Sequence, residues 1–423
     1  MHHFAYRNGV LHCEDVSLEA VARELGTPAY VYSDATLRRH YSVLADAFAN
    51  RNVLIAYAVK ANSNLGVIAT LAEMGAGADV VSGGELMKAM EAGVPANRIV
   101  FSGVAKTAEE MKIGLTRGIH QFNVESLPEL HRLSKIASEM GKRAPIAFRV
   151  NPHVEAGGHA HISTGPAEHK FGIAWHEADA FYDEASRLPG IDPVGIAVHI
   201  GSQIMRVEQF RAAWEKVVAL VRRLRDRGFA ISRVDFGGGL GVPYKDGEDP
   251  DSPLVYANQA RDVLGSLDVQ LIFEPGRLIA GNAGVLISKV EYIKERDGRT
   301  FVILDAGMND LMRPALYSAY HEVLPVRTPA LGATRSPVDL VGPICESTDR
   351  FAKDRSMPPL HEGDLVAFMP AGAYGATLSS QYNSRPLVAE ALVRGDACVV
   401  VRRRPTFDEM IALERAPDWI ASG

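Results

Sequence analysis

The stretch VLIAYAVK at residues 53–60 decides the fold class of this chain, because a strand-like apolar run ends in a lysine. An unbroken apolar run of this length is typical of a β-strand that is buried on both faces, as in a parallel sheet. A lysine is unexpected at the end of such a strand. Burial opposes its positive charge, so we expect Lys60 to present a reactive amine that can bond to a carbonyl carbon. A lysine that extends its amine into solvent is the alternative.

Around this stretch, short apolar runs alternate with segments of helical periodicity between residues 52 and 276. Strands that alternate with helices pair in parallel, and eight such strands close into a (β/α)8 barrel of the TIM type. An open doubly wound sheet is the alternative, but no Gly-x-Gly-x-x-Gly follows the first strand. The expected strands are 53–59, 78–82, 99–102, 121–124, 146–150, 194–199, 233–236 and 270–273, and the clearest helical segments are 65–74, 85–92, 108–117, 127–140 and 209–227.

The pattern changes after residue 284, where β-rich runs are separated by Gly and Pro turns. This pattern predicts a separate C-terminal β domain, which could be a barrel or a sandwich. The first residues, 4–11, also have a strand pattern and could complete that domain. We therefore expect a barrel at residues 34–280 and a β domain built from residues 1–33 and 281–423.

Composition excludes several classes of protein. The 423 residues have a net charge of −6 and no basic stripe, so nucleic acid is not an expected partner. The three cysteines are too few for a disulfide framework and fit a reducing compartment. No signal peptide or membrane-spanning run is present, so we expect a cytoplasmic protein. The histidines have no metal-ligand spacing, so we expect no metal site.

Polar residues and glycines follow most of the expected strands. In a barrel of this kind the active site lies at the carboxyl ends of the strands. Each segment alone could be a turn, but together they predict one site. The segments are Lys60, Ser82–Glu85, Arg149–Pro152, His199–Gln203, Gly237–Gly241 and Glu274–Arg277.

The glycine run Gly237–Gly241 offers backbone N–H groups without Cβ obstruction, so it predicts a phosphate site, with a flexible turn as the alternative. Ser202 could add a hydroxyl to that phosphate or cap the next helix. His199 could stack on a flat cofactor or be a core histidine bonded to backbone. Glu274 needs a cationic partner, either a protonated pyridine nitrogen or a structural arginine.

Two further segments lie in the expected β domain. Cys345 and Glu346 stand together between turn residues, which favours a reactive cysteine over a small buried one. The segment GAYGA at 372–376 and the segment YNSRP at 382–386 are polar and aromatic, with a surface turn as the alternative.

Taken together, these residues resemble the fold-type III pyridoxal-phosphate decarboxylases over nearly the whole chain. Within that family the chain is most similar to the members that act on meso-diaminopimelate. The matching blocks are YAVKANSN (57–64), HISTG with HKFGI (161–173), HIGSQ (199–203), GGGLG (237–241), EPGR (274–277), MNDLMRPALYSAYH (308–321), GPICESTD (342–349) and AGAYGATLSSQYNSRP (371–386). A single departure, Gln381 where the family has asparagine, leaves the cofactor assignment unchanged.

The resemblance implies an enzyme that uses pyridoxal 5'-phosphate. Lys60 is the residue expected to bind the cofactor covalently, His199 to pack on its ring and Glu274 to pair with its ring nitrogen. The phosphate is expected to be held by Ser202, Gly238, Gly239, the backbone of Gly276 and Arg277, and Tyr374.

The resemblance also implies a substrate and a reaction. Arg277, Arg313 and Tyr317 are expected to hold the distal carboxylate, Glu346 and Tyr374 to complete the substrate site, and Cys345 to donate a proton. The expected reaction is loss of CO2 from the D-centre of meso-2,6-diaminopimelate to give L-lysine, the last step of lysine synthesis. Cys345 and Glu346 are expected from a partner subunit, in a homodimer with its active sites at the interface.

Other functions remain open from the sequence. The same scaffold could act on D-lysine, D-ornithine or carrier-bound glutamate. A non-catalytic pyridoxal-phosphate-binding protein resembles the barrel alone, whereas this chain also carries the β domain. A racemase disagrees with Glu274 and Cys345.

Overall fold

The computed structural model describes residues 2–154 and 170–420, and its contacts divide the chain into two compact units. One unit spans Thr36–Gly281, and the other combines Met1–Ala35 with Asn282–Gly423. The motif HISTG, expected to carry family residues at 161–165, lies outside the described residues.

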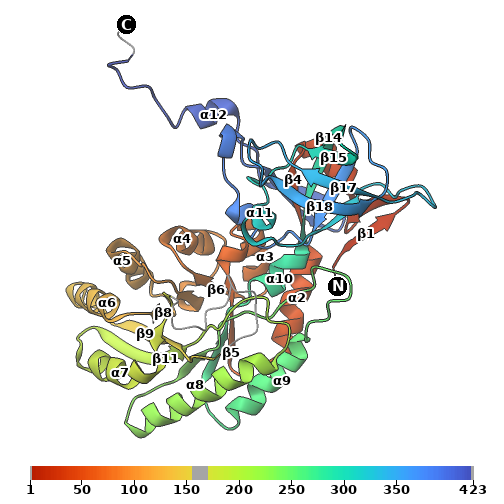
Figure 1. Ribbon diagram of the computed structural model, residues 1–423. Helices are drawn as coiled ribbons and strands as arrows, with labels where there is room; N and C mark the ends of the chain where they lie inside the picture. The colour runs from red at the N-terminus through yellow and green to blue at the C-terminus, as the bar shows by residue number, and fades with distance from the viewer. Residues whose placement is uncertain (1, 155–169, 421–423) are drawn as a thin grey trace. The chain divides into compact units, whose positions relative to one another are not determined.

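The unit Thr36–Gly281 is a closed (β/α)8 barrel, which confirms the predicted fold class (Figure 1). Every strand pair in it is parallel, and pairing of the last strand in the sheet order, β8, with β9 closes the cylinder. A two-residue strand, β10 (Ile173–Ala174), extends the sheet at β9. The barrel strands are β5 (Val53–Ala58), β6 (Gly77–Val80), β7 (Ile99–Phe101), β8 (Gln121–Val124), β9 (Ala144–Asn151), β11 (Ile191–Ala197), β12 (Arg233–Asp235) and β13 (Gln270–Phe273).

Several helices of this unit begin at side chains that cap their free N–H groups. Thr107 and Glu110 form a capping box at α5, and Ser82, Ser126 and Ser252 cap α4, α6 and α9. The helices are α2 (Asp34–Ala47), α3 (Leu65–Glu73), α4 (Gly83–Glu91), α5 (Ala108–Arg117), α6 (Leu127–Glu139), α7 (Ala178–Arg187), α8 (Glu208–Asp226), α9 (Pro253–Leu264) and the short α10 (Arg277–Ala280).

The barrel packs through two layers of side chains. Outside the strands, Trp214 of α8 stacks on Phe236, with ring centroids 4.7 Å apart, and contacts Tyr256 of α9 edge-on. Inside, Leu54, Val100 and Ile272 meet in one buried cluster although their strands are not all neighbours. The polar residues at the strand ends therefore rest on an apolar floor.

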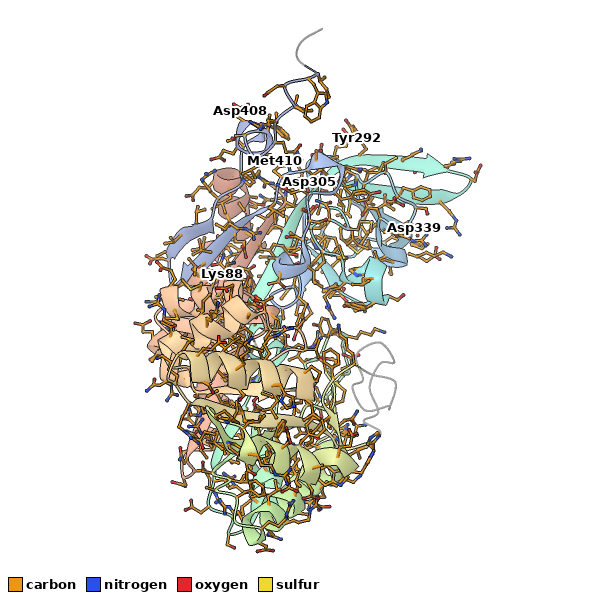
Figure 2. The ribbon with its side chains drawn as sticks, turned by 90° about the vertical axis from the view of Figure 1, so that its left-hand side faces the viewer. Lys88, Tyr292, Asp305, Asp339, Asp408 and Met410 are labelled. Atoms are coloured by element: carbon orange, nitrogen blue, oxygen red, sulfur yellow. The ribbon has the colours of Figure 1, made fainter. Side chains whose placement is uncertain are left out.

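The second unit is a β domain in which two sheets share the long strand β14 (Gly284–Arg296). A register shift between Val290 and Tyr292 marks the place where β14 passes from one sheet to the other. Asp305, which follows β15 (Figure 2), accepts hydrogen bonds from Ser288 Oγ at 2.7 Å and from Lys289 N at 2.9 Å. The remaining elements are α1 (Leu18–Leu25), β4 (Ala29–Ser33), β15 (Arg299–Leu304), α11 (Arg313–Tyr317), β16 (Glu322–Pro325), β17 (Ser336–Val341), β18 (Arg350–Met357), β19 (Leu365–Met369), β20 (Ala389–Arg394), β21 (Ala397–Arg402) and α12 (Phe407–Ile411).

The N-terminal segment differs in detail from the prediction. Residues 4–11 are not one strand: β1 (Phe4–Arg7) and β2 (Val10–Cys13) form a hairpin, joined by β3 (Val16–Ser17). Asn8 and Gly9 both have positive φ, which is the backbone of a tight hairpin turn. The strand that completes the large sheet is β4, between β14 and β20.

The predicted strands and helices of the barrel exist, with ends that shift by a few residues. The helices α2, α7 and α9 were not among the helical segments named from the sequence. Among the residues that the structure describes, none of the helices has the length and apolar character needed to cross a membrane.

Candidate active site

A cavity of about 610 Å³ opens at the carboxyl ends of the barrel strands. Three of the residues predicted for the cofactor, Lys60, His199 and Glu274, line it. The structure therefore brings together residues that are more than 200 positions apart in the sequence. Its other lining residues include Ser102, Asn123, Arg149 and Asp235.

Lys60 lies in the turn that directly follows strand β5. Strand β5 ends at Ala58, and Val59–Ala61 form a single 3₁₀ turn. The Lys60 side chain is 40% exposed and its Nζ lies 2.8 Å from Oδ2 of the buried Asp79. The expectation that apolar burial alone makes this amine reactive is therefore wrong, because an ion pair with Asp79 holds it.

Glu274 lies in a cluster of buried acidic and amide groups. Asn123 Nδ2 lies 3.0 Å from Asp235 Oδ2 and 3.4 Å from Glu274 Oε1, so one amide group contacts both carboxyls. Ser102 Oγ lies 3.4 Å from the same Glu274 oxygen. Burial raises the pKa of Glu274 well above its usual value, and the nearby Asp235 and Asp79 raise it further. Glu274 therefore tends to carry a proton in this setting.

The ring of His199 is held by the glycine loop. The N–H of Gly238 donates to His199 Nδ1 at 3.3 Å, so Nδ1 is the unprotonated nitrogen. Burial, and then the positive charges of Arg149 and Lys60, lower the pKa of His199 well below its usual value. A neutral imidazole results, which suits a flat contact with an aromatic ring.

The loop Gly237–Gly241 passes too close to neighbouring backbone for any side chain. A Cβ on Gly238 would lie 2.2 Å from the carbonyl oxygen of Glu274, and one on Gly239 would lie 2.4 Å from that of Gly201. Gly237 and Gly239 also have positive φ. The glycines therefore bring the loop after β12 into contact with the loops after β11 and β13.

Ser202 and Arg277, two of the other residues predicted for the phosphate and the distal carboxylate, contact each other at the carboxyl ends of the barrel strands. Arg277 Nη2 donates to Ser202 Oγ at 3.2 Å, and Arg277 Nη1 donates to the hydroxyl of Tyr244 at 2.5 Å. Gly276 immediately precedes α10. Tyr244 was not singled out in the sequence, because an isolated tyrosine in a polar loop carries no pattern.

In the β domain, the segment 342–349 folds around one buried carboxylate. Asp349 accepts hydrogen bonds from the N–H groups of Met308 and Ile344, both at 2.6 Å. Cys345 and Glu346 stand exposed on this loop. Asn383 Oδ1 accepts from the Cys345 N–H at 3.0 Å, and the hydroxyl of Tyr382 donates to Glu346. The predicted segments GPICESTD and YNSRP therefore lie side by side.

The remaining predicted residues of the β domain are placed on short turns. Arg313 begins the helix α11, is buried, and lies 3.0 Å from His321 Nε2 through Nη1. Tyr317 ends that helix, just before Ser318 with its positive φ. Tyr374 itself has a φ of 56° and is partly exposed. The roles of these residues stay predictions.

Sequence reasoning missed three polar residues that line the barrel cavity or contact a side chain that lines it. They are polar side chains within otherwise apolar strands, where an inward-facing polar residue is costly unless it has partners. A polar residue inside an otherwise apolar strand could have been recognised in the segments GADV, QFNV and RVDF. The missed residues are Asp79, Asn123 and Asp235.

The chain matches known proteins over its full length. The family described as pyridoxal-dependent decarboxylase, pyridoxal binding domain, matches residues 34–281. The diaminopimelate decarboxylase of Pseudomonas fluorescens is 50% identical over 97% of this chain and 98% of its own length. The chain belongs to the diaminopimelate decarboxylase family.

Solved structures of this family share the fold. Diaminopimelate decarboxylase from Helicobacter pylori, complexed with L-lysine, is 40% identical with a TM-score of 0.90, covering 93% of this chain and 98% of that one. The enzyme from M. jannaschii in complex with L-lysine is 35% identical with a TM-score of 0.93, covering 98% of each chain. These matches confirm the predicted family and an enzyme that uses pyridoxal phosphate.

The residues of the barrel cavity fit this cofactor. The Lys60 amine opens into the cavity, where an aldehyde could reach it, and His199 offers a neutral ring. The glycine loop lies so close to the loops after β11 and β13 that Gly237, Gly238 and Gly239 could carry no side chain. The buried carboxyl of Glu274 suits a basic ring nitrogen. A buried oxygen, Asp79 Oδ1, has no hydrogen-bond partner among the described residues.

Proposed function

We propose that this enzyme removes CO2 from the D-configured centre of meso-2,6-diaminopimelate and releases L-lysine, the last step of lysine biosynthesis. The observation that carries the proposal is full-length similarity to diaminopimelate decarboxylases, together with a barrel cavity that holds Lys60, His199 and Glu274. Bound pyridoxal phosphate supplies a conjugated ring that delocalises the electron pair left on Cα when CO2 departs.

Within the barrel, the proposed roles follow from position and charge. Lys60 binds the cofactor covalently, and Asp79 orients its amine from a distance of 2.8 Å. His199 covers the ring as a neutral imidazole. Glu274 holds a proton where the ring nitrogen needs one, which favours decarboxylation, whereas an arginine in that position would favour racemisation. Ser202, Gly238, Gly239, Gly276 and Arg277 hold the phosphate.

The proposed roles in the β domain concern the substrate. Arg313 is a guanidinium that can hold a carboxylate through two hydrogen bonds, and Tyr317 lies one helical turn away. Arg277 and Arg313 together suit a substrate with a second carboxylate. Glu346 binds the distal ammonium group. Cys345, with its exposed thiol, donates a proton to Cα. Tyr374 completes the phosphate and substrate contacts.

We also propose a homodimer in which Cys345 and Glu346 serve the partner's barrel. Both are exposed on a loop fixed by Asp349, as expected for side chains that act on another molecule. The three free cysteines fit a reducing compartment, so we place the enzyme in the cytoplasm.

A substrate panel tests the proposal. The purified enzyme, loaded with pyridoxal phosphate, is incubated separately with meso-diaminopimelate, D-lysine and D-ornithine, and CO2 and the amine product are measured. We expect CO2 and L-lysine from meso-diaminopimelate alone. Release of CO2 from D-lysine or D-ornithine but not from meso-diaminopimelate would reject the substrate while leaving the cofactor chemistry in place.

A further inference from the structure

Two carboxyl groups in the barrel lie too close together to act independently. Asp235 ends β12, Glu274 follows β13, and these two strands are neighbours in the barrel. Asp235 is 1% exposed and Glu274 is 9% exposed. Asn123 Nδ2 lies 3.0 Å from Asp235 Oδ2 and 3.4 Å from Glu274 Oε1, so one amide group contacts both carboxyls. Two buried carboxyls held this close repel each other when both are charged, which favours a single proton for the pair.

The hydrogen-bond partners of Asp235 and Glu274 show which of the two carboxyls holds the proton. Asp235 Oδ1 accepts from the N–H of Gly237 at 2.9 Å, and Asp235 Oδ2 accepts from Asn123 Nδ2 at 3.0 Å. Two such donors stabilise a charged carboxylate. The contacts of Glu274 are longer, at 3.4 Å to both Ser102 and Asn123. Asp235 is therefore the charged member and Glu274 the member that holds the proton.

Asn123 is fixed in the orientation that this arrangement needs. Gln121 Nε2 donates to Asn123 Oδ1 at 2.8 Å, so the Asn123 amide must turn its NH2 group towards the carboxyls. The same NH2 group also lies 3.1 Å from Ser102 Oγ. All of these groups are buried, so their hydrogen bonds are protected from water.

We propose that Asp235 is a positioning residue for Glu274: the two carboxyls share one proton, Asn123 bridges them, and Asp235 thereby keeps the proton on Glu274 at the floor of the cofactor cavity. This inference rests on the proposed function, because the protonated Glu274 is the group that faces the ring nitrogen. Burial raises the pKa of Asp235 to about 6 and that of Glu274 well above its usual value.

Other charged and titratable groups face the pair from several elements. Asp79 of β6 raises the pKa of both carboxyls, and Lys60 lowers that of Glu274. Tyr256 of α9 stays neutral, since burial and the two acids raise its pKa. None of these groups donates the hydrogen bonds that Asp235 receives.

The titration of the pair can be measured on the full chain with the cofactor removed. Infrared spectroscopy follows the carbonyl stretch of protonated carboxyls as the pH rises. We expect the wild-type band of the pair to persist above pH 6. In Asp235→Asn the shared proton is lost, and the band of Glu274 should titrate about one pH unit or more lower. Asp310, whose burial raises its pKa to about 7, contributes equally to both proteins and cancels in the difference.

A second variant shifts the same band in the opposite direction. Asn123→Ala removes a donor to the charged carboxylate, so the pair should keep its proton to a higher pH. Glu390→Gln is the matched control: Glu390 is a buried carboxyl of the β domain, paired with Arg402, and its loss should leave the titration of the pair unchanged. Shifts of opposite sign cannot come from general loosening of the barrel.

The loaded enzyme gives an independent measurement. The pH titration of the bound cofactor's absorbance should move in Asp235→Asn and stay in place in Glu390→Gln, and kcat should fall more than KM rises. An unchanged carboxyl titration in Asp235→Asn, or an equal shift in Glu390→Gln, would overturn the inference. Because the infrared titration needs neither substrate nor turnover, its result stands even if the proposed substrate is wrong.

Discussion

At the scale of single residues, the lysine proposed to bind the cofactor is paired with a carboxylate. Lys60 lies beside Asp79 at 2.8 Å, in a cavity whose other wall carries His199. An ion pair fixes the direction of the amine, which apolar burial could not do. The position of the amine therefore depends on a buried acidic residue of the neighbouring strand β6.

The first prediction concerns Lys60 itself. Lys60→Ala should abolish covalent attachment of the cofactor, because no amine remains at the end of β5 to bond its aldehyde. Borohydride reduction fixes the cofactor to the protein, and the mass of the protein then shows whether the covalent adduct is present. Lys88→Ala is the control, since the Lys88 amine on α4 is exposed and donates to Ser63 at 3.2 Å (Figure 2). Retention of the covalent adduct in Lys60→Ala would assign another lysine.

The second prediction concerns substrate recognition. Arg313→Ala should raise KM for meso-diaminopimelate about tenfold or more and leave cofactor binding intact, because a charge-assisted pair with a carboxylate is lost. Steady-state kinetics and the absorbance of the bound cofactor measure the two effects. Arg327→Ala serves for comparison, since Arg327 pairs with Glu19 at the surface of the same domain. An unchanged KM would remove Arg313 from the substrate site.

At the scale of elements, a buried ion pair anchors the loop that follows β7. Lys106 Nζ contacts Glu129 Oε1 and the carbonyl oxygens of Gly103 and Asn123, each at 2.7 Å. Through Asn123 this lysine supports the strand that bridges the two acids of the cavity. The loop residues Gly103, Val104 and Ala105 in turn line the cavity.

The third prediction tests that anchor. Lys106→Met should lower the free energy of unfolding by about 3–5 kcal/mol, because Glu129 is left buried without its charge partner. Denaturant unfolding of the cofactor-free protein measures it. The double variant Lys106→Met with Glu129→Met should recover much of the loss, since neither charge remains. A single variant as stable as wild type would show that the pair is not an anchor.

The sequence predicted the barrel better than the site. Alternating strands and helices specify a parallel closed sheet, because each apolar run and each helical period is local information. Lys60, His199 and Glu274 were predicted because they follow such runs. Asp79, Asn123 and Asp235 lie within the runs, and their partners come from strands up to 151 residues away, as in the contact of Asn123 with Glu274. Only the closed barrel brings those polar residues together.

At the scale of the whole molecule, the proposed site needs residues from two kinds of domain. The barrel supplies Lys60 and the β domain supplies Cys345, which is exposed on the loop around Asp349. If these groups meet across a dimer interface, neither subunit alone completes a site. That arrangement makes activity a property of the assembly.

The fourth prediction concerns mixed dimers of two variants that lack different residues of the proposed site. Lys60→Ala and Cys345→Ala, each with little activity alone, should regain about a quarter of wild-type activity when mixed after dissociation, because half of the dimers are then mixed and each holds one intact site. Sedimentation checks that dimers reform. Mixed dimers without activity would place Lys60 and Cys345 of one chain in the same site.

The central claim is decarboxylation at the D-configured centre, and isotopic labelling tests it most directly. The loaded enzyme is given meso-diaminopimelate with its label in the carboxyl group at that centre, and CO2 and product are analysed together. The account predicts labelled CO2 and unlabelled L-lysine in equal amounts. Label that remains in the amino acid product, or no CO2 from an enzyme whose Lys60 still holds the cofactor, would contradict it.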